Sequence, residues 1–253
     1  MTLPYILLSA VRDRLIAAIG IGLIAIWLVA AFAGSTSIAE EGAAATVFAG
    51  FGARLLVVFG IVLFVSLQVR RLAESGEMHV LLATPISRTR FVIQAWAGFA
   101  VLAIGFAVAA GGIAALAGWS VAQPFGLAVW TGTLALEAVV MAAFALFVAL
   151  GLRGMIAGLI VCLGFYALTR MLGVILAIAR SEYAPAEAKD GVVGRAVDLL
   201  GLVLPRLDLL AESRWLVYGI EATGSVGLAT LQAVAYTLVL VAAAVFDARG
   251  RAL

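Results

Sequence analysis

The chain has 253 residues, of which 65% are hydrophobic and only 12% are charged, and its formal net charge is +2. Soluble domains are about 45–50% apolar and about 25% charged, so this composition excludes a soluble enzyme, a soluble DNA-binding domain and a disulfide-linked scaffold. With one histidine and one cysteine, a single chain cannot build a bis-histidine haem site, a metal site with several such ligands, or a disulfide. The only lysine, Lys189, lies between Ala188 and Asp190, which excludes a phosphate-binding P-loop.

The segment ahead of the first apolar stretch is amphipathic. Tyr5, Leu8 and Val11 share one helical face, and charged residues follow at 12–14. This pattern predicts a helix lying on the membrane surface over residues 1–14. The later run Ala-Phe-Ala at 31–33 resembles a signal-peptidase site, but the apolar stretch before it is longer than the 7–15 residues of a signal peptide. We therefore expect this stretch to be retained as a membrane helix.

Uncharged apolar stretches then alternate with clusters of charge along the whole chain. A membrane-spanning helix needs about 20 apolar residues, and each stretch is long enough. The sequence predicts an all-α membrane protein with a single transmembrane domain over 1–253. Its six spans cover about 15–34, 49–69, 91–117, 125–150, 155–179 and 226–246.

The distribution of arginine predicts the orientation. If the N-terminus is cytoplasmic, nine arginines lie on the cytoplasmic side in the N-terminal segment, the short loops and the C-terminal segment. The short loops on the other side, around 35–48 and 118–124, contain no basic residue. The longer connection at 180–225 carries basic residues but weighs less in this rule. We expect both termini on the cytoplasmic face of a bacterial inner membrane.

The connection between the second and third spans, residues 70–90, has basic residues at both ends and an apolar middle. Met78, Leu81 and Leu82 recur at helical spacing, and Pro85 ends any helix there. The pattern predicts a short amphipathic helix over about 74–83. Its apolar strip must be covered by the membrane surface or by a partner protein.

This connection contains the runs Glu-Ser-Gly (74–76) and Leu-Leu-Ala-Thr-Pro-Ile-Ser-Arg (81–88). Placed between the second and third of six spans, they resemble the permease subunit of ABC-2-type ABC transporters. Two departures are Gly-Glu-Met-His at 76–79, where family members often have Gly-Thr-Leu-Glu, and Gln-Ala at 94–95, where a Gly-Lys usually follows. The alternative is an ordinary connector with a surface-lying helix.

The resemblance implies that the connection is a coupling helix that docks on a separate ATPase subunit. It also implies a dimer of such ATPases as partner, with ATP and Mg bound there and no cofactor in this chain, and a second copy or a homologous permease beside it. Membrane lipids complete the partners, and no nucleic acid is expected. The docking residues would be Glu74, Glu77, Met78, His79, Leu81, Leu82, Thr84, Pro85, Arg88 and Arg90.

The external segment 180–225 is too interrupted by charge to contain another span. The apolar run 192–204 predicts a helix at the outer interface. Residues 209–220 predict a second such piece, with Trp215 and Tyr218 suited to the interfacial belt. The ABC-2 family places short re-entrant or interfacial helices here, and a plain membrane-hugging loop is the alternative.

Three charged residues fall inside predicted spans. Glu137 and Arg170 lie near the midpoints of the fourth and fifth spans, about 4 Å apart in depth. An isolated charge there costs about 2.5–3.5 kcal/mol, so the two are expected either to pair or to line a substrate pathway. Arg54 lies a few residues into the second predicted span, and we expect it to extend outward as an anchor.

The sequence thus favours the membrane permease subunit of an ABC transporter, an exporter rather than an importer because exporters dominate the family. Without chemistry of its own, it would couple ATP hydrolysis in the partner to substrate movement. A homodimer is the first expectation and a heterodimer the second. The alternative is an ion-coupled secondary transporter using Glu137 and Arg170. An intramembrane enzyme would need a catalytic set that one deep carboxylate does not provide.

Overall fold

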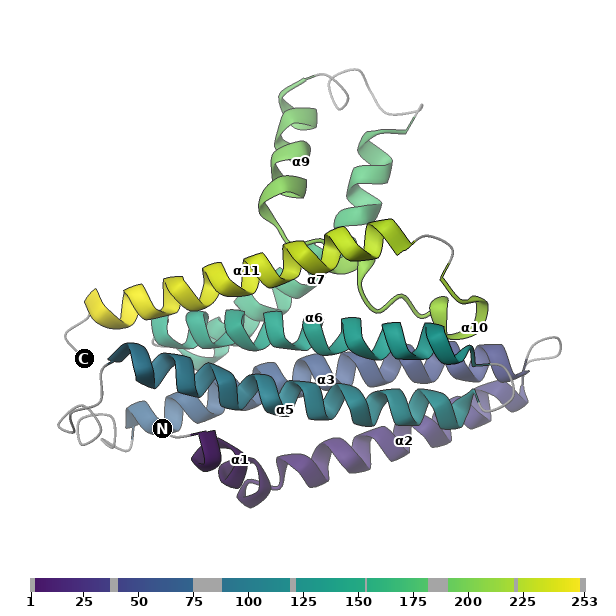
Figure 1. Ribbon diagram of the computed structural model, residues 1–253, viewed down its shortest axis with the longest axis horizontal. Coiled ribbons are helices and arrows are strands. Elements are labelled where there is room, and N and C mark those ends of the chain that lie inside the picture. Colours follow the sequence, from purple (N-terminus) through teal and green to yellow (C-terminus); the bar gives the residue numbers. More distant parts are fainter. Residues whose placement is uncertain are drawn as a thin grey trace.

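The computed structural model describes residues 3–36, 41–74, 88–118, 122–152, 154–181, 191–220 and 223–250. Over these ranges the regular elements are all helices (Figure 1). The all-α prediction is confirmed for this part of the chain.

Six helices in the described ranges are long and apolar enough to cross a membrane. At 1.5 Å per residue, each reaches the roughly 30 Å of a bilayer's hydrocarbon core. The chain is therefore a multi-pass membrane protein. These helices are α2 (Leu15–Ser35), α3 (Glu41–Glu74), α5 (Arg88–Ala117), α6 (Pro124–Gly151), α7 (Met155–Ala179) and α11 (Thr223–Gly250).

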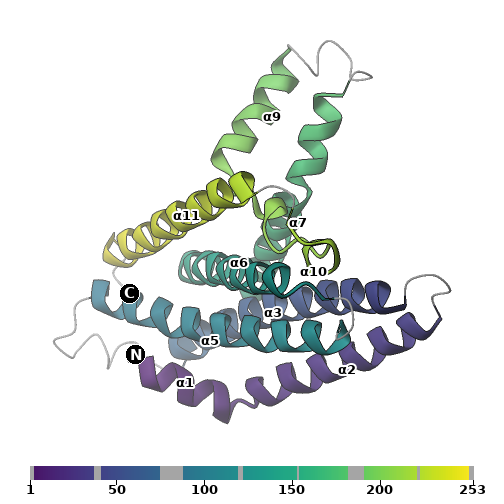
Figure 2. The ribbon, with the colours of Figure 1, turned by 45° about the vertical axis from the view of Figure 1, so that its right-hand side comes forward.

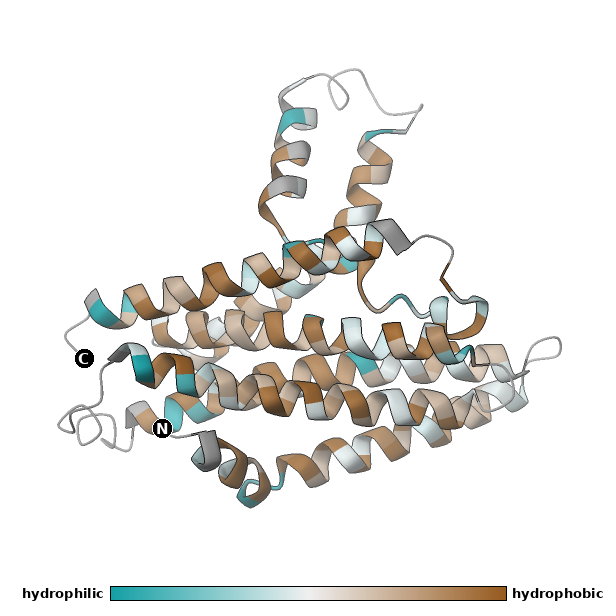
Figure 3. Cartoon of the chain, in the orientation of Figure 1, coloured by the Kyte–Doolittle hydropathy of each residue, from teal (hydrophilic) through white to brown (hydrophobic). Residues whose placement is uncertain are grey.

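The helix α6 lies at the centre of the bundle and is the most buried of the six, with α5, α3, α11 and α7 packed around it. Small side chains allow this close packing: Ala103, Ala107, Ala110 and Ala114 of α5 are all fully buried. Helices in a membrane associate through such close contacts, because lipid gives no hydrophobic driving force between them. By contrast α2 packs mainly on α3 at the edge and is the least buried span. Apolar residues cover the exposed lengths of the spans (Figure 3).

The short N-terminal helix α1 (Leu3–Arg12) turns sharply into α2 at Arg14, whose φ is 57°. Ile6 and Ala10 are fully buried, and Ile6 lies against Gly98 of α5. The predicted apolar face, which includes Leu8, stays exposed. The helix therefore has two apolar faces, one packed on the bundle and one free of it.

One pair of elements stands away from the rest. The second half of α7 and the helix α9 (Val192–Val203) pack on each other and project from the side of the bundle (Figures 1 and 2). The chain then returns to the bundle through the 3₁₀ turn η1 (Leu207–Leu209) and the single-turn helix α10 (Trp215–Tyr218).

Candidate functional site

A buried cluster of charged and polar side chains joins α6 to α7. Glu137 of α6 is fully buried. The hydroxyl of Tyr166 donates a hydrogen bond to its Oε1 at 2.8 Å, and Nη1 of Arg170 lies 3.6 Å from its Oε2. Tyr166 and Arg170 are four residues apart and so share one face of α7. The two charges singled out in the sequence therefore pair, and whether they also line a pathway stays a prediction.

Arg54 of α3 belongs to the same cluster. Its side chain is buried, its Nη1 donates to the carbonyl of Ala211 at 3.1 Å, and its guanidinium lies 5.2 Å from the ring centre of Phe51. It also interacts electrostatically with Glu137 and Tyr166. The prediction of an outward-facing anchor is wrong. Because α3 begins at residue 41, Arg54 lies about 20 Å inside the helix, too deep to extend out of it.

The backbone that completes this cluster comes from residues 205–218, which we call the re-entrant segment. Nη1 of Arg170 donates to the carbonyls of Leu207 and Leu210 at 2.5 and 2.6 Å. The carbonyl of Ala211 accepts from Arg54 and also from Nε1 of Trp130 at 3.1 Å. Non-helical backbone at membrane depth is tolerated only where protein groups satisfy it. Here Arg54 and Arg170 supply hydrogen-bond donors to these carbonyls.

Tight contacts hold the re-entrant segment against the bundle. A Cβ atom on Gly126 of α6 would lie 1.9 Å from the carbonyl oxygen of Trp215, so only glycine fits this close approach. The amide of Gln123 donates to the carbonyl of Leu216 at 3.0 Å, and the amide of Ala211 donates to Thr133 Oγ1 at 3.1 Å.

These contacts correct the predicted interfacial piece over 209–220. Trp215 is only 4% exposed and lies inside the bundle, whereas Tyr218 is 67% exposed. The physical reason is that the segment's carbonyls are needed to solvate buried arginines, which draws the chain inward. Residues 192–203 do form the expected helix, α9.

The start of the segment is fixed to α11 and, at a second point, to α7. Gln232 of α11 accepts from the amide of Arg206 at 3.3 Å and donates to the carbonyl of Leu204 at 3.1 Å. The carboxylate of Asp208 pairs with Arg206 and lies against Gly173 of α7, where a side chain would collide with it. The hydrogen bonds that Arg206 donates to Asp208 raise the pKa of Arg206 above its usual value. The re-entrant segment is therefore packed into one half of the bundle, and we call that half the plugged end.

Chemically, the cluster is suited to holding helices together. It sets one carboxylate against two guanidinium groups and a phenol, with no adjacent nucleophile and base among these residues. Among the described residues, Oε2 of Glu137 has no hydrogen-bond partner besides its ion pair, and no group of three histidine, cysteine, aspartate or glutamate residues is placed to bind a metal. What the cluster does is cross-link α3, α6, α7 and the re-entrant segment.

The opposite end of the bundle carries the ends of the predicted coupling connection. Seven of the ten residues predicted to dock on the ATPase lie outside the described ranges, namely Glu77, Met78, His79, Leu81, Leu82, Thr84 and Pro85. Glu74 ends α3, while Arg88 and Arg90 lie in the first turn of α5. Beside them, Arg249 near the end of α11 donates to the Thr89 hydroxyl at 2.8 and 2.9 Å. Both described chain ends lie here as well (Figure 1), and we call this the terminal end.

Sequence reasoning missed three members of the buried cluster: Tyr166, Trp130 and Thr133. Tyr166 could have been found, because it lies one turn before Arg170 on the same helical face. Trp130 and Thr133 bind backbone groups of a segment about 80 residues away, and no local pattern marks such contacts.

Comparison with protein-family models gives no match for this chain, and comparison with curated proteins gives none either. The fold and the site define a multi-pass helical membrane protein, with six candidate spans in the described ranges and a plugged end.

Proposed function

We propose that the chain is the membrane permease subunit of an ABC transporter of the ABC-2 type, and that it works as an exporter. The observation that carries this proposal is the run at 74–88 and its place, between the second and third of six spans. In this proposal the run docks on a separate ATPase subunit, which binds ATP and Mg and hydrolyses the ATP. We assign no catalytic step to the permease itself.

The path of α3 supports a mechanical role for this connection. This helix runs without a break from Glu41 to Glu74 over 34 residues, about 50 Å. About 20 Å from its first residue it carries Arg54, which binds the re-entrant segment. Its last residue begins the connection. A displacement of the connection by the ATPase would therefore tilt α3 and pull Arg54 against the carbonyl of Ala211.

The surface of the bundle supports assembly with a second copy. The projecting second half of α7 and the helix α9 expose large apolar side chains, among them Ile178, Leu199 and Val203 at 60% or more. In this proposal two permease subunits enclose the pathway between them, as a homodimer first and a heterodimer second. The exposed face of α1 rests on the cytoplasmic surface of the inner membrane, and both termini are cytoplasmic.

An ion-coupled secondary transporter is the second candidate, favoured by one observation: Oε2 of buried Glu137 has no hydrogen-bond partner among the described residues. Such an oxygen could receive a proton during transport. E137Q separates the two candidates. An ABC permease keeps ATP-dependent transport if the variant folds, whereas a proton-coupled transporter loses coupling.

The test of the main proposal is purification of the tagged chain from its own membranes in mild detergent, followed by mass identification of co-eluting proteins and an ATPase assay. We expect a nucleotide-binding subunit and ATPase activity in the same peak. The double variant L81D/L82D should lose both. The control V80D places one aspartate on the opposite face of the expected helix and should keep both. An intact chain that never carries an ATPase would contradict the proposal.

A further inference from the structure

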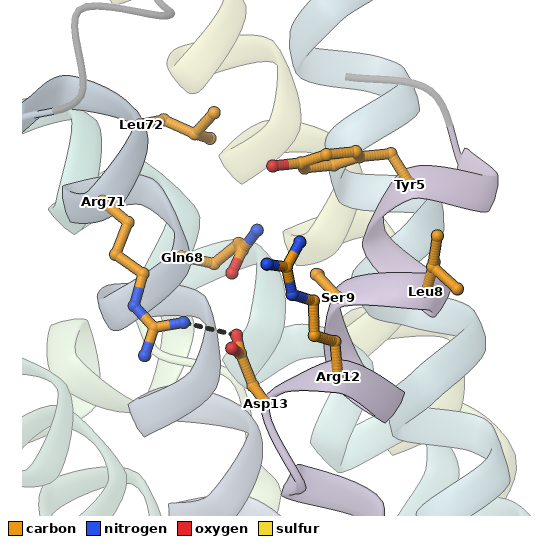
Figure 4. Close-up of a pocket in the computed structure, with 8 residues that line it drawn as sticks. All are labelled: Tyr5, Leu8, Ser9, Arg12, Asp13, Gln68, Arg71 and Leu72. Atoms are coloured by element: carbon orange, nitrogen blue, oxygen red, sulfur yellow. Dashed lines mark hydrogen bonds and ion pairs between the residues drawn. The ribbon is translucent and has the colours of Figure 1, made fainter.

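A cavity of about 300 Å³ lies between α1 and the last turns of α3 at the terminal end (Figure 4). Its polar lining comes from two elements, with one leucine from each helix beside it. These polar residues are Tyr5, Ser9, Arg12 and Asp13 from α1 and the turn after it, and Gln68 and Arg71 from α3.

The charges in this cavity do not cancel. Arg71 is paired with Asp13, whose Oδ2 lies 2.5 Å from Nη1. The Arg12 guanidinium points into the same space as the Gln68 amide (Figure 4), and the structure gives Arg12 no ion pair among the described residues. Because Asp13 is the only acid in the lining, the cavity keeps a surplus positive charge. It is therefore suited to an anion.

Gln68 is a second, independent observation that points to a ligand. The residue is 96% buried by the bundle, its 4% exposure faces the cavity, and it has no hydrogen-bond partner among the described residues. Its amide therefore opens into the cavity, where a ligand oxygen can take the place of water as its partner. The Ser9 hydroxyl already donates its proton to the carbonyl of Ile6 at 2.8 Å, so it has none to give to the amide oxygen of Gln68. A ligand oxygen that accepts from Gln68 and Arg12 together would satisfy both.

The position of the cavity indicates where the anion comes from. It lies beside the last turns of α3, with Arg71 three residues before the helix ends at Glu74. In a bilayer, the end of a spanning helix lies against the head groups. Beside it, Leu8 of α1 and Ile16 of α2 are exposed, and the rest of α2 is the least buried span. Acyl chains could lie along that helix while a head group enters the cavity. Basic pockets between spans bind anionic head groups in this way.

We propose that this cavity binds the phosphate group of an anionic phospholipid, held by Arg12 and Gln68. The lipid ties α1 to α3 where the two helices otherwise meet through the pair of Asp13 and Arg71. This proposal does not depend on the transporter assignment, because it requires only that the terminal end lies at a membrane surface.

The test measures retained lipid by native mass spectrometry and thermal unfolding of the full-length chain. The chain is reconstituted in phosphatidylglycerol or in phosphatidylcholine, with inorganic phosphate added to the second in a separate arm. We expect one tightly retained phosphatidylglycerol and a higher unfolding temperature in that lipid, with no such rise from inorganic phosphate. R12Q and Q68L should each weaken retention about tenfold. Q68L changes no charge and should fold, since leucine suits a buried position.

The matched control is R14Q, which removes the same charge two residues away, outside the cavity lining. It should weaken retention far less than R12Q. Equal losses in R12Q and R14Q with none in Q68L would show diffuse surface attraction and overturn the proposal. If inorganic phosphate raised the unfolding temperature equally, the ligand would be a free anion and not a lipid. Retention of an acidic peptide in place of lipid would also overturn the proposal.

Discussion

The two ends of the bundle are held in different ways. At the plugged end, Arg54 is buried and the side chain of Arg170 is only 18% exposed, and both bind backbone carbonyls. At the terminal end the polar contacts are exposed: the side chains of Arg71 and Asp13 are 57% and 27% exposed, and the bonds from Arg249 to Thr89 are exposed as well. Exposed pairs contribute at most about 1 kcal/mol, whereas breaking a buried pair costs several times more. The plugged end is therefore the rigid one.

This difference suits a protein whose helices are displaced by a partner that binds at one end. The terminal end, whose polar contacts are exposed, carries the connection at 74–88 that we propose as the docking site of an ATPase. In that proposal α3 would transmit the displacement of the connection to the plugged end. The predictions below test this contrast, starting with the strongest contacts.

The largest effect is expected from R170M. Removing the guanidinium leaves Glu137 buried without its ion-pair partner. It also takes the arginine donor from the carbonyls of Leu207 and Leu210, of which the carbonyl of Leu207 keeps the amide of Leu210. The free energy of unfolding should fall by about 3–5 kcal/mol, measured by denaturation of the purified chain in detergent. R195M on α9, whose arginine is exposed, is the control and should stay near the parent value. Parental stability for R170M would mean that the cluster does not hold the plug.

The next effect is expected from G126A. The new Cβ would lie 1.9 Å from the carbonyl oxygen of Trp215, so the re-entrant segment must shift, at a cost of about 3 kcal/mol. Trp215 fluorescence and resistance to protease near the segment should change together. G132A on the same helix has no atom within 4 Å of its Cβ and should leave both unchanged. If the two variants behave alike, the close approach does not matter.

A smaller effect is expected from Y166F, which removes the hydroxyl that donates to Glu137 Oε1 at 2.8 Å and keeps the ring. The carboxylate then loses one hydrogen bond in a buried site, and the free energy of unfolding should fall by about 1–2 kcal/mol. The same denaturation assay measures it. In the double variant Y166F/E137Q, the two losses should be less than additive, because both act on one network. Full additivity would place the two residues in separate interactions.

The smallest effect is expected from D13N at the terminal end. The variant removes the exposed pair with Arg71, so the free energy of unfolding should change by less than about 1 kcal/mol. Raising the salt concentration should reduce the difference between parent and variant, because salt screens exposed charges. A loss as large as that of R170M would contradict the contrast between the two ends.

The sequence was sufficient for the spans and for the depth of Glu137 and Arg170, because length, apolar composition and the cost of buried charge are local properties. It was insufficient for Arg54, because the span predicted from about residue 49 begins at residue 41 in α3, which places Arg54 deeper in the helix. It also failed for Trp215, whose burial depends on carbonyls of its own segment reaching arginines on α3 and α7. Such contacts join distant parts of the chain, and no periodicity records them.

The most direct test of the central claim places a photoreactive residue at position 81, in the connection, or at position 116, near the plugged end of α5, in the chain as expressed in its own membranes. We predict that position 81 cross-links to a nucleotide-binding ATPase and that position 116, where Leu116 is 58% exposed, gives no such product. Cross-links from position 81 to lipid alone, or equal ATPase products from both positions, would contradict the account.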